Sequence, residues 1–403
     1  MKKMIRLLVV SVALFSLAGV CFAQAVTIVF WHSYRGMEKD ALEEVGANFT
    51  KAHPDIRIQF LQVPFDALPD KITAAVPRGK GPDVFIFGHD RVGYWADKKV
   101  LEPLGLWVKK DMASLYMPST LEALTYEDAL YGLPTSLKCT ALIYNKKLIK
   151  TPPKDTNEMI ALAKKNTNVA QNKFGLVYEI GLTYYNSSWL FGYGGGIFDK
   201  NDEPIVNSPG NVKALAFIYD LYRIQNIMPE EITNTLVTTL FNRGQAAMVI
   251  SGPWFLGEIE KGVDFAVAPL PVISEIKAKP RPFLTVEAMF MSSQSARKKE
   301  AFEVLKYFTS KEALLVMAKK GGQPVANLQA YDDPDVKNHP FIPVFKLQAE
   351  TAVPMPNIAE MMMVWTPFDL AIGKVLNKTA KPKEALDEAQ GKIIKDIETF
   401  RQQ

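Results

Sequence analysis

Cysteine and histidine are scarce in this sequence, and their scarcity argues against several kinds of protein. The 403 residues contain two cysteines and four histidines. Cys21 lies in a short N-terminal segment, so the rest of the chain has only Cys139 and cannot form an intramolecular disulfide. Structural zinc and haem sites draw on clusters of these residues. We therefore expect no metal and no cofactor, and we expect packed cores to stabilise the fold.

Long hydrophobic runs are absent after the N-terminus. Three basic residues precede an apolar run over residues 7–20, a pattern typical of a secretory signal. We expect residues 1–23 to be removed by cleavage after Ala23, which predicts a periplasmic protein. Lipidation of Cys21 is the alternative, although a bulky residue, Val20, precedes it. No later run reaches the ~18 apolar residues of a membrane-spanning helix, so the mature chain is predicted to be soluble.

An excess of charge of either sign is also missing. The formal net charge is +4, and it falls to +1 without the signal peptide, which carries three basic residues and no acid. A nearly neutral protein has no electrostatic attraction to nucleic acid, so we expect no nucleic-acid partner. The hydrophobic content of 48% and the chain length are sufficient for two domains, each with its own core.

The first part of the mature chain alternates strand and helix patterns. β-branched and aromatic residues predict strands at 26–31, 56–60 and 83–87, and apolar spacing predicts helices at 37–51 and 69–76. This order is typical of an α/β fold with a parallel sheet. Ligands of such sheets bind beyond the carboxyl ends of the strands. The segments after the first and third strands are therefore expected to face a binding site.

The remaining chain alternates in the same way and contains no repeat and no linker. The absence of a linker indicates that two domains share several crossings of the chain or are tightly docked. Strands are expected at 140–144, 246–250 and 265–268, and helices at 156–165, 212–225 and 297–309.

Five short motifs, taken together in this order and spacing, resemble one protein family. They are GPD at 81–83 running to HDR at 89–91, ALIYNK at 141–146, SGPW at 251–254, KPRPF at 279–283, and MPNI at 355–358 followed by Trp365. With them the whole mature chain resembles the maltose- and maltodextrin-binding proteins among the extracellular solute-binding proteins of bacterial ABC importers.

This resemblance implies an α/β fold of two lobes, each with a mostly parallel sheet flanked by helices, and a sugar cleft between them. The chain would cross between the lobes near residues 137, 285 and 325. The N-terminal lobe would comprise residues 24–136 and 286–325, and the C-terminal lobe residues 137–285 and 326–403. The protein would be a monomer that closes on an oligosaccharide by a hinge motion and delivers it to a membrane ABC permease.

Polar and aromatic residues at family positions are the candidate sugar contacts. Asp90 can accept hydrogen bonds from sugar hydroxyls, and Arg91 can donate them; otherwise the two form a solvated ion pair. Arg35, where the family usually has Lys, is either a sugar contact or a surface charge.

Aromatic rings would cover the apolar faces of the sugar. Trp254, Tyr184 and Trp365 match stacking positions of the family, although Tyr185 is an alternative to Tyr184 and a lone tryptophan is more often part of a core. Phe87 stands at a further contact position, where the family usually has Trp.

Two charged residues at candidate ligand-binding positions also depart from the family pattern. Lys138 stands where an acid is usual, and Asp369 stands where Arg is usual. We expect the sugar class to be kept while the preferred linkage or chain length changes, with trehalose as one alternative ligand. Glu287, near a predicted crossing, is expected to be a solvated structural residue.

Other classes of function fit the sequence less well. A secreted glycosidase needs two carboxylates at a defined separation, and Asp90 is a poor general acid because the adjacent Arg91 favours the ionised carboxylate. Adjacent tyrosines at 184 and 185 resemble those of ferric-iron-binding relatives, but that reading leaves the tryptophans without a role. The three methionines at 361–363 are interpreted as packing residues. We therefore expect a binding protein and not an enzyme.

Overall fold

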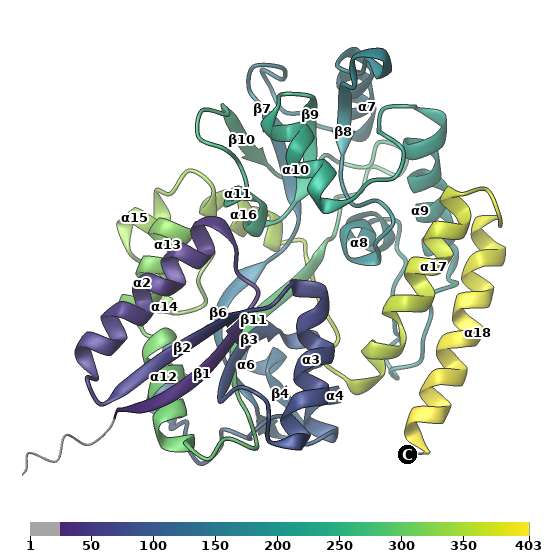
Figure 1. Ribbon diagram of the computed structural model, residues 1–403. Coiled ribbons are helices and arrows are strands. Elements are labelled where there is room, and N and C mark those ends of the chain that lie inside the picture. Colours follow the sequence, from purple (N-terminus) through teal and green to yellow (C-terminus); the bar gives the residue numbers. More distant parts are fainter. Residues whose placement is uncertain (1–24, 403) are drawn as a thin grey trace, which may run out of the picture.

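Two mixed sheets with helices packed against them form the molecule (Figure 1). The computed structural model describes residues 25–402, so the predicted signal peptide and Cys21 lie outside the described residues. None of the helices between residues 25 and 402 combines the length and the apolar character that crossing a bilayer requires.

The first sheet lies in the lower half of Figure 1 and the second in the upper half. The first has the order β12-β11-β3-β1-β2, with β6 also paired to β11, and the second has the order β10-β7-β9-β8. The strands of the first sheet are β1 (Val26–His32), β2 (Ile56–Gln62), β3 (Val84–Gly88), β6 (Gly132–Lys138), β11 (Phe283–Met291) and β12 (Val353–Pro354); those of the second are β7 (Ala141–Asn145), β8 (Phe174–Val177), β9 (Ala246–Ser251) and β10 (Phe265–Ala268); and β4 (Thr125–Tyr126) pairs with β5 (Ala129–Leu130).

The helices cover both faces of the sheets, and the predicted helices are present within a few residues of their expected bounds. The predicted helix at 212–225 is divided into an α-helix and a π-helical turn, η5 (Asp220–Ile224). The longer helices are α2 (Gly36–Ala52), α3 (Leu68–Ala75), α7 (Thr156–Lys165), α8 (Thr183–Gly192), α9 (Pro209–Tyr219), α10 (Asn234–Asn242), α12 (Lys298–Phe308), α13 (Lys311–Gly321), α16 (Ile342–Ala349), α17 (Trp365–Leu376) and α18 (Pro382–Arg401).

Several short helical segments lie near the ends of strands or between helices. They are η1 (Phe65–Ala67), η2 (Val76–Arg78), η3 (His89–Arg91), α4 (Val92–Asp97), α5 (Lys110–Ala113), α6 (Pro118–Ala123), η4 (Val169–Gln171), α11 (Pro253–Leu256), α14 (Leu328–Tyr331), α15 (Pro334–Lys337) and η6 (Ala359–Met363).

The two-lobed α/β class is confirmed, but the sheets are more mixed than the expected mostly parallel ones. β1 runs parallel to β2 and β3, whereas β11 runs antiparallel to β3 and β6. In the second sheet β7 is antiparallel to both its neighbours, and only β8 and β9 pair in parallel. Strand patterns in the sequence locate strands but carry no direction, because direction depends on pairing between distant segments.

Alternating side chains of the first sheet pack on opposite faces. Phe30 belongs to the core under α2, α12 and α13, while Trp31 belongs to the core under α3 and α4. In the second sheet Leu142 packs with α8, α9, α17 and α18, and Ile143 packs on the other face with α10 and α16. Both sheets are therefore buried on two sides, which explains why their strands are nearly continuous apolar runs.

We propose that the chain crosses between the lobes near residues 137 and 285, two of the three predicted places. β6 of the first sheet is followed almost directly by β7 of the second, and β11 begins in the core of the second sheet and ends in that of the first. We propose one change to the expected lobe boundaries. Ala330, Val336 and Ile342 pack in the core of the first sheet, so the last crossing falls in α16 and not at residue 326.

Candidate functional site

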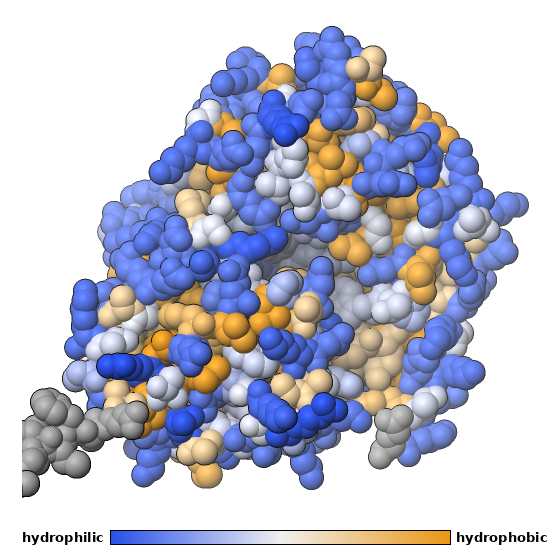
Figure 2. Space-filling view, viewed as in Figure 1, coloured by the Kyte–Doolittle hydropathy of each residue, from blue (hydrophilic) through white to orange (hydrophobic). Residues whose placement is uncertain are grey.

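Three aromatic residues that the sequence predicts as sugar contacts form one cluster. The Tyr184 ring lies 5.9 Å from Trp254 and 6.2 Å from Phe283, and Phe283 lies 5.9 Å from Trp365, all measured between ring centroids. Tyr184, Trp254 and Trp365 are each only partly buried. Figure 2 shows the molecule hollowed between its two halves. The cluster therefore presents partly accessible apolar rings that can stack on the faces of pyranose rings.

A polar pair from the first sheet lies beside this cluster. Asp90 and Arg91 follow β3 in η3, and their side chains form an ion pair with 3.5 Å between Nε and Oδ2. Asp90 and Thr285 both lie close to Gly88. A Cβ at Gly88 would lie 2.8 Å from Asp90 Oδ1 and 3.2 Å from the Thr285 methyl group. The Thr285 hydroxyl in turn lies 3.0 Å from the Tyr184 hydroxyl. A buried Asp90 and a partly exposed Arg91 thus lie near the aromatic rings where the two sheets join.

His89, next to Asp90 in the chain, anchors η3 through two hydrogen bonds to the backbone. Its Nε2–H donates to the carbonyl of Met355 over 2.9 Å, and its Nδ1 accepts from the backbone N–H of Val286 over 3.0 Å. Only the neutral ring can make both bonds, because a protonated Nδ1 cannot accept. Burial lowers the pKa of His89 below its usual value. The neutral ring therefore connects η3 to β11 and to the segment before η6.

Because two histidines are buried, we expect the free energy of unfolding to fall in acid. The pKa of His32 is lowered to about 4, by burial and by the charge of Lys39, and that of His89 is also lowered. The unfolded chain binds protons near pH 6.5, so the stabilisation is present above that pH and is lost as the pH falls towards the lowered values. Each histidine contributes up to about 1.4 kcal/mol per pH unit within that window. Buried carboxyls such as Glu179, with a raised pKa, act in the opposite direction.

Urea unfolding between pH 7 and pH 4.5 measures this effect. The matched variant carries His32→Gln and His89→Gln, because glutamine offers a donor and an acceptor but takes up no proton. We expect the free energy of unfolding to depend less on pH in the variant. Equal slopes in the two proteins would contradict the role given to these histidines.

Arg35 joins the two halves of the molecule. Its side chain is half exposed and makes a 2.8 Å ion pair with Glu258 and a 3.4 Å hydrogen bond to Asn234, both from the half built around the second sheet. Next to it, Gly36 has φ of +48°, and a Cβ there would lie 2.2 Å from the carbonyl oxygen of Gly257. The backbones touch here, so Arg35 lies at a contact between the lobes and keeps free N–H donors for a ligand.

Glu179 is an acid near the aromatic cluster that was not predicted from the sequence. Glu179 follows β8, and its carboxylate lies 3.5 Å from the Asn234 amide. Burial raises its pKa most; hydrogen bonds from Tyr185 and Asn234 lower it, and the charges of Asp66 and Glu258 raise it. β8 was not predicted as a strand. Had it been, the position of Glu179 at its carboxyl end would have marked it as a candidate.

Two predicted contacts have structural partners in the protein. Phe87 is 4% exposed and is stacked against the ring of Phe65. The prediction that its ring contacts the sugar is therefore wrong. Asp369 accepts a 2.6 Å hydrogen bond from the backbone N–H of Thr183. That bond satisfies a free N–H at the start of α8, the helix that carries Tyr184. Asp369 therefore positions the aromatic cluster.

The sequence matches a family model along most of its length. A model of the bacterial extracellular solute-binding proteins matches residues 36–314. The chain belongs to this family. The match includes η3 and α11, which carry the polar pair and Trp254, while α17 with Trp365 lies beyond it.

Similar proteins of the family cover nearly the whole chain. The maltotriose-binding protein of Pyrococcus abyssi (strain GE5 / Orsay) is 29% identical over 378 residues, which are 92% of this chain and 82% of that relative. The galactooligosaccharide-binding protein of Bacillus subtilis (strain 168) is 30% identical over 376 residues, 90% of this chain and 87% of the relative. Similarly related members thus carry the names of different sugars.

Solved structures of solute-binding proteins share this fold. The Thermus thermophilus maltotriose binding protein, bound with maltotriose, has a TM-score of 0.86 at 30% identity and covers 92% of this chain and 100% of its own. The maltose/maltodextrin-binding domain from Bdellovibrio bacteriovorus, bound to maltotriose, has a TM-score of 0.87 at 27% identity, with 93% and 100% covered.

Lys138 is not an accessible sugar contact in this member of the family. Its ammonium lies 3.0 Å from Glu38 and 2.9 Å from Glu287, and all three side chains are nearly buried. The expectation of a solvated Glu287 is wrong, since its carboxylate also accepts bonds from Tyr34 at 2.5 Å and Ser136 at 3.2 Å. Burial lowers the pKa of Lys138, but the two carboxylates raise it more, and the pKa lies above its usual value.

This charged triad of Glu38, Lys138 and Glu287 joins three elements of the chain. Lys138 ends β6, Glu287 lies on β11, and Glu38 lies on α2. Gln323, in the segment after α13, donates to Glu38 over 2.9 Å. The triad therefore ties the ends of β6 and β11 that adjoin the second sheet to α2.

Both tyrosines of the iron-binding alternative have partners within the protein. The Tyr184 hydroxyl lies 3.0 Å from that of Thr285, and the Tyr185 ring packs edge-on against Trp254 at 6.4 Å. Across residues 25–402, no three or more His, Cys, Asp or Glu side chains are grouped so that they could hold a metal ion. Of the three methionines at 361–363, Met361 is buried in the core, as predicted.

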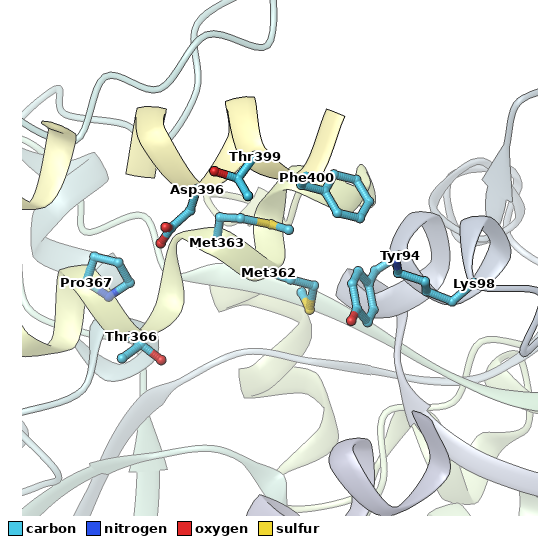
Figure 3. Close-up of a pocket in the computed structure, with 9 residues that line it drawn as sticks. All are labelled: Tyr94, Lys98, Met362, Met363, Thr366, Pro367, Asp396, Thr399 and Phe400. Carbon is cyan, nitrogen blue, oxygen red and sulfur yellow. The ribbon is translucent and has the colours of Figure 1, made fainter. Parts of the chain in front are cut away.

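Two cavities lie away from the polar pair. One of about 350 Å³ lies between α4 and the C-terminal helices (Figure 3). The other, of about 410 Å³, lies between the end of α8 and the segment after α16. The first is lined by Tyr94, Lys98, Met362, Met363, Thr366, Pro367, Asp396, Thr399 and Phe400. None of the predicted sugar contacts lines either cavity.

Proposed function

We propose that this protein is the periplasmic receptor of an ABC importer for oligosaccharides of the maltodextrin type. The supporting observation is the partly exposed cluster of Tyr184, Trp254 and Trp365 beside the Asp90–Arg91 pair. Stacking rings and hydroxyl-binding groups on opposite sides of one junction are what a sugar requires. Two similar proteins carry maltotriose in their names, and one carries galactooligosaccharide.

The ligand would be held between the lobes and released intact to the membrane permease. Closure around the sugar would bend the crossings that the charged triad connects. The protein is proposed to be a monomer and not an enzyme. Mass spectrometry of maltotriose after long incubation with the protein tests the last point, and a hydrolysed sugar would contradict it.

A thermal-shift screen of the mature protein tests the sugar class. The sugars are maltose, maltotriose, longer maltodextrins, trehalose, cellobiose and a galactooligosaccharide mixture. A ligand at 100 times its dissociation constant stabilises the folded state by about 2.7 kcal/mol. We expect maltotriose to raise the melting temperature by a few degrees and cellobiose to have no effect. No shift with any of these sugars would contradict the proposal.

A further inference from the structure

Phe65 is an exposed aromatic residue at the edge of the first sheet. It begins η1, directly after β2, and 57% of its surface is accessible to solvent. β1, β2 and β3 run parallel, so the segments that follow them emerge at the same edge of the sheet. Arg35 and Asp90 follow β1 and β3 respectively. Phe65 therefore belongs to the edge at which ligands of such sheets bind.

The ring of Phe65 is fixed by a second ring behind it. Phe65 and Phe87 are stacked, with centroids 5.1 Å apart and planes inclined by 19°. Phe87 is 4% exposed and packs edge-on against Trp95 at 5.6 Å. One face of Phe65 is thus covered by Phe87, and the ring remains largely accessible to solvent. A ring already held in position loses little conformational freedom when a ligand binds.

The segment η1 lies beside a contact between the two halves of the molecule. Gln62, at the end of β2, donates to the carbonyl of Tyr34 over 2.9 Å. The next residue, Arg35, pairs with Glu258 of the other half at 2.8 Å. η1 therefore follows β2 next to this contact, and it carries Asp66, whose carboxylate can accept bonds from sugar hydroxyls.

We infer that Phe65, supported by Phe87, is the aromatic platform of the first lobe for one pyranose ring of the bound oligosaccharide. The sequence assigns this contact to Phe87, but that ring is covered. Two stacked phenylalanines take the place of the single tryptophan expected there, and the ring that meets the sugar is moved outward by one layer. This inference rests on the proposed function and names a contact within the same site.

Calorimetric titration of maltotriose into the wild-type protein and into Phe65→Ala tests the inference. We expect the variant to bind about tenfold more weakly, which corresponds to about 1.4 kcal/mol, because the sugar loses both the stacking contact and the apolar area of the ring. Phe65→Trp should retain the wild-type affinity. The control is Leu106→Ala, which removes a side chain that is 98% exposed elsewhere on the first lobe and should leave the affinity unchanged.

The outcomes separate this inference from the proposed function. The melting temperature of ligand-free Phe65→Ala should equal that of the wild type, so a weaker affinity would not come from unfolding. Equal affinity of wild type and Phe65→Ala for maltotriose would overturn the platform role alone and leave the proposed function standing. Wild-type protein that binds neither maltotriose nor the galactooligosaccharide mixture would overturn the proposed function and the inference with it.

Discussion

Replacing Lys138 with methionine is expected to lower the free energy of unfolding by about 3–5 kcal/mol, because it leaves two buried carboxylates without their cation. Glu38 and Glu287 both lie within 3.0 Å of the Lys138 ammonium and are shielded from water. Their mutual repulsion would then be opposed only by hydrogen bonds from neutral groups. Urea unfolding at pH 7 measures the loss. Part of it should be recovered at lower pH, where a carboxyl can take up a proton.

Two comparisons show whether the loss comes from the buried charge. Lys146→Met breaks an ion pair with Asp264 of similar length, 3.0 Å, in which both side chains are about half exposed. That variant should lose only about 0–1 kcal/mol. A triple variant with Glu38→Gln, Lys138→Met and Glu287→Gln removes all three charges and should recover much of the stability. A similar loss in Lys138→Met and Lys146→Met would contradict the role of the triad.

Replacing Trp254 with alanine is expected to weaken the binding of maltotriose by about 30-fold or more, corresponding to about 2 kcal/mol for a central aromatic contact. Trp254 packs against both Tyr184 and Tyr185, at 5.9 and 6.4 Å, and is partly exposed. Its removal would leave the cluster without one of its two partly exposed tryptophan rings. Calorimetric titration gives the affinity directly.

A second tryptophan provides the control for this variant. Trp107 packs against Phe302 at 5.3 Å in the core of the first sheet, away from the cluster. Trp107→Ala should reduce the stability of the protein and leave the affinity for maltotriose nearly unchanged. Unchanged affinity in Trp254→Ala, or an equal loss in both variants, would contradict the assignment of the site.

The elements of the fold follow closely from local patterns in the sequence. β10 occupies the predicted residues, and β1 and α2 differ from prediction by one or two residues at their ends. These elements are recognisable because apolar residues recur with the period of a strand or a helix. The direction of β7 and β11 could not be read in this way. Their partners lie far away along the chain, and pairing alone decides direction.

Some residues of the candidate site could be predicted from the sequence, whereas the roles of others depend on partners that the sequence does not show. The aromatic residues at 184, 254 and 365 come together in the structure, as the family pattern leads one to expect. Lys138 and Asp369, in contrast, have partners from distant parts of the chain, Glu287 and Thr183. Burial and pairing are properties of the folded chain. A charged residue at a ligand position therefore cannot be assigned to the ligand from its type alone.

Phe65 and Glu179 are candidate contacts that the sequence did not predict. Both follow strands at their carboxyl ends, yet neither lies in a motif that resembles the family. Phe65 becomes a candidate because it covers Phe87 and remains 57% exposed. Glu179 becomes one through its contact with the Asn234 amide. Exposure and neighbours across the junction of the lobes are set by the tertiary fold.

A crystal structure of the mature protein with maltotriose tests the central claim most directly. The account predicts one trisaccharide between the lobes, with sugar rings against Trp254 and Trp365 and hydroxyls within hydrogen-bonding distance of Asp90 or Arg91. Maltotriose bound instead in the cavity beside Tyr94 and Phe400, or a site between the lobes that stays free of sugar at saturating concentration, would contradict it.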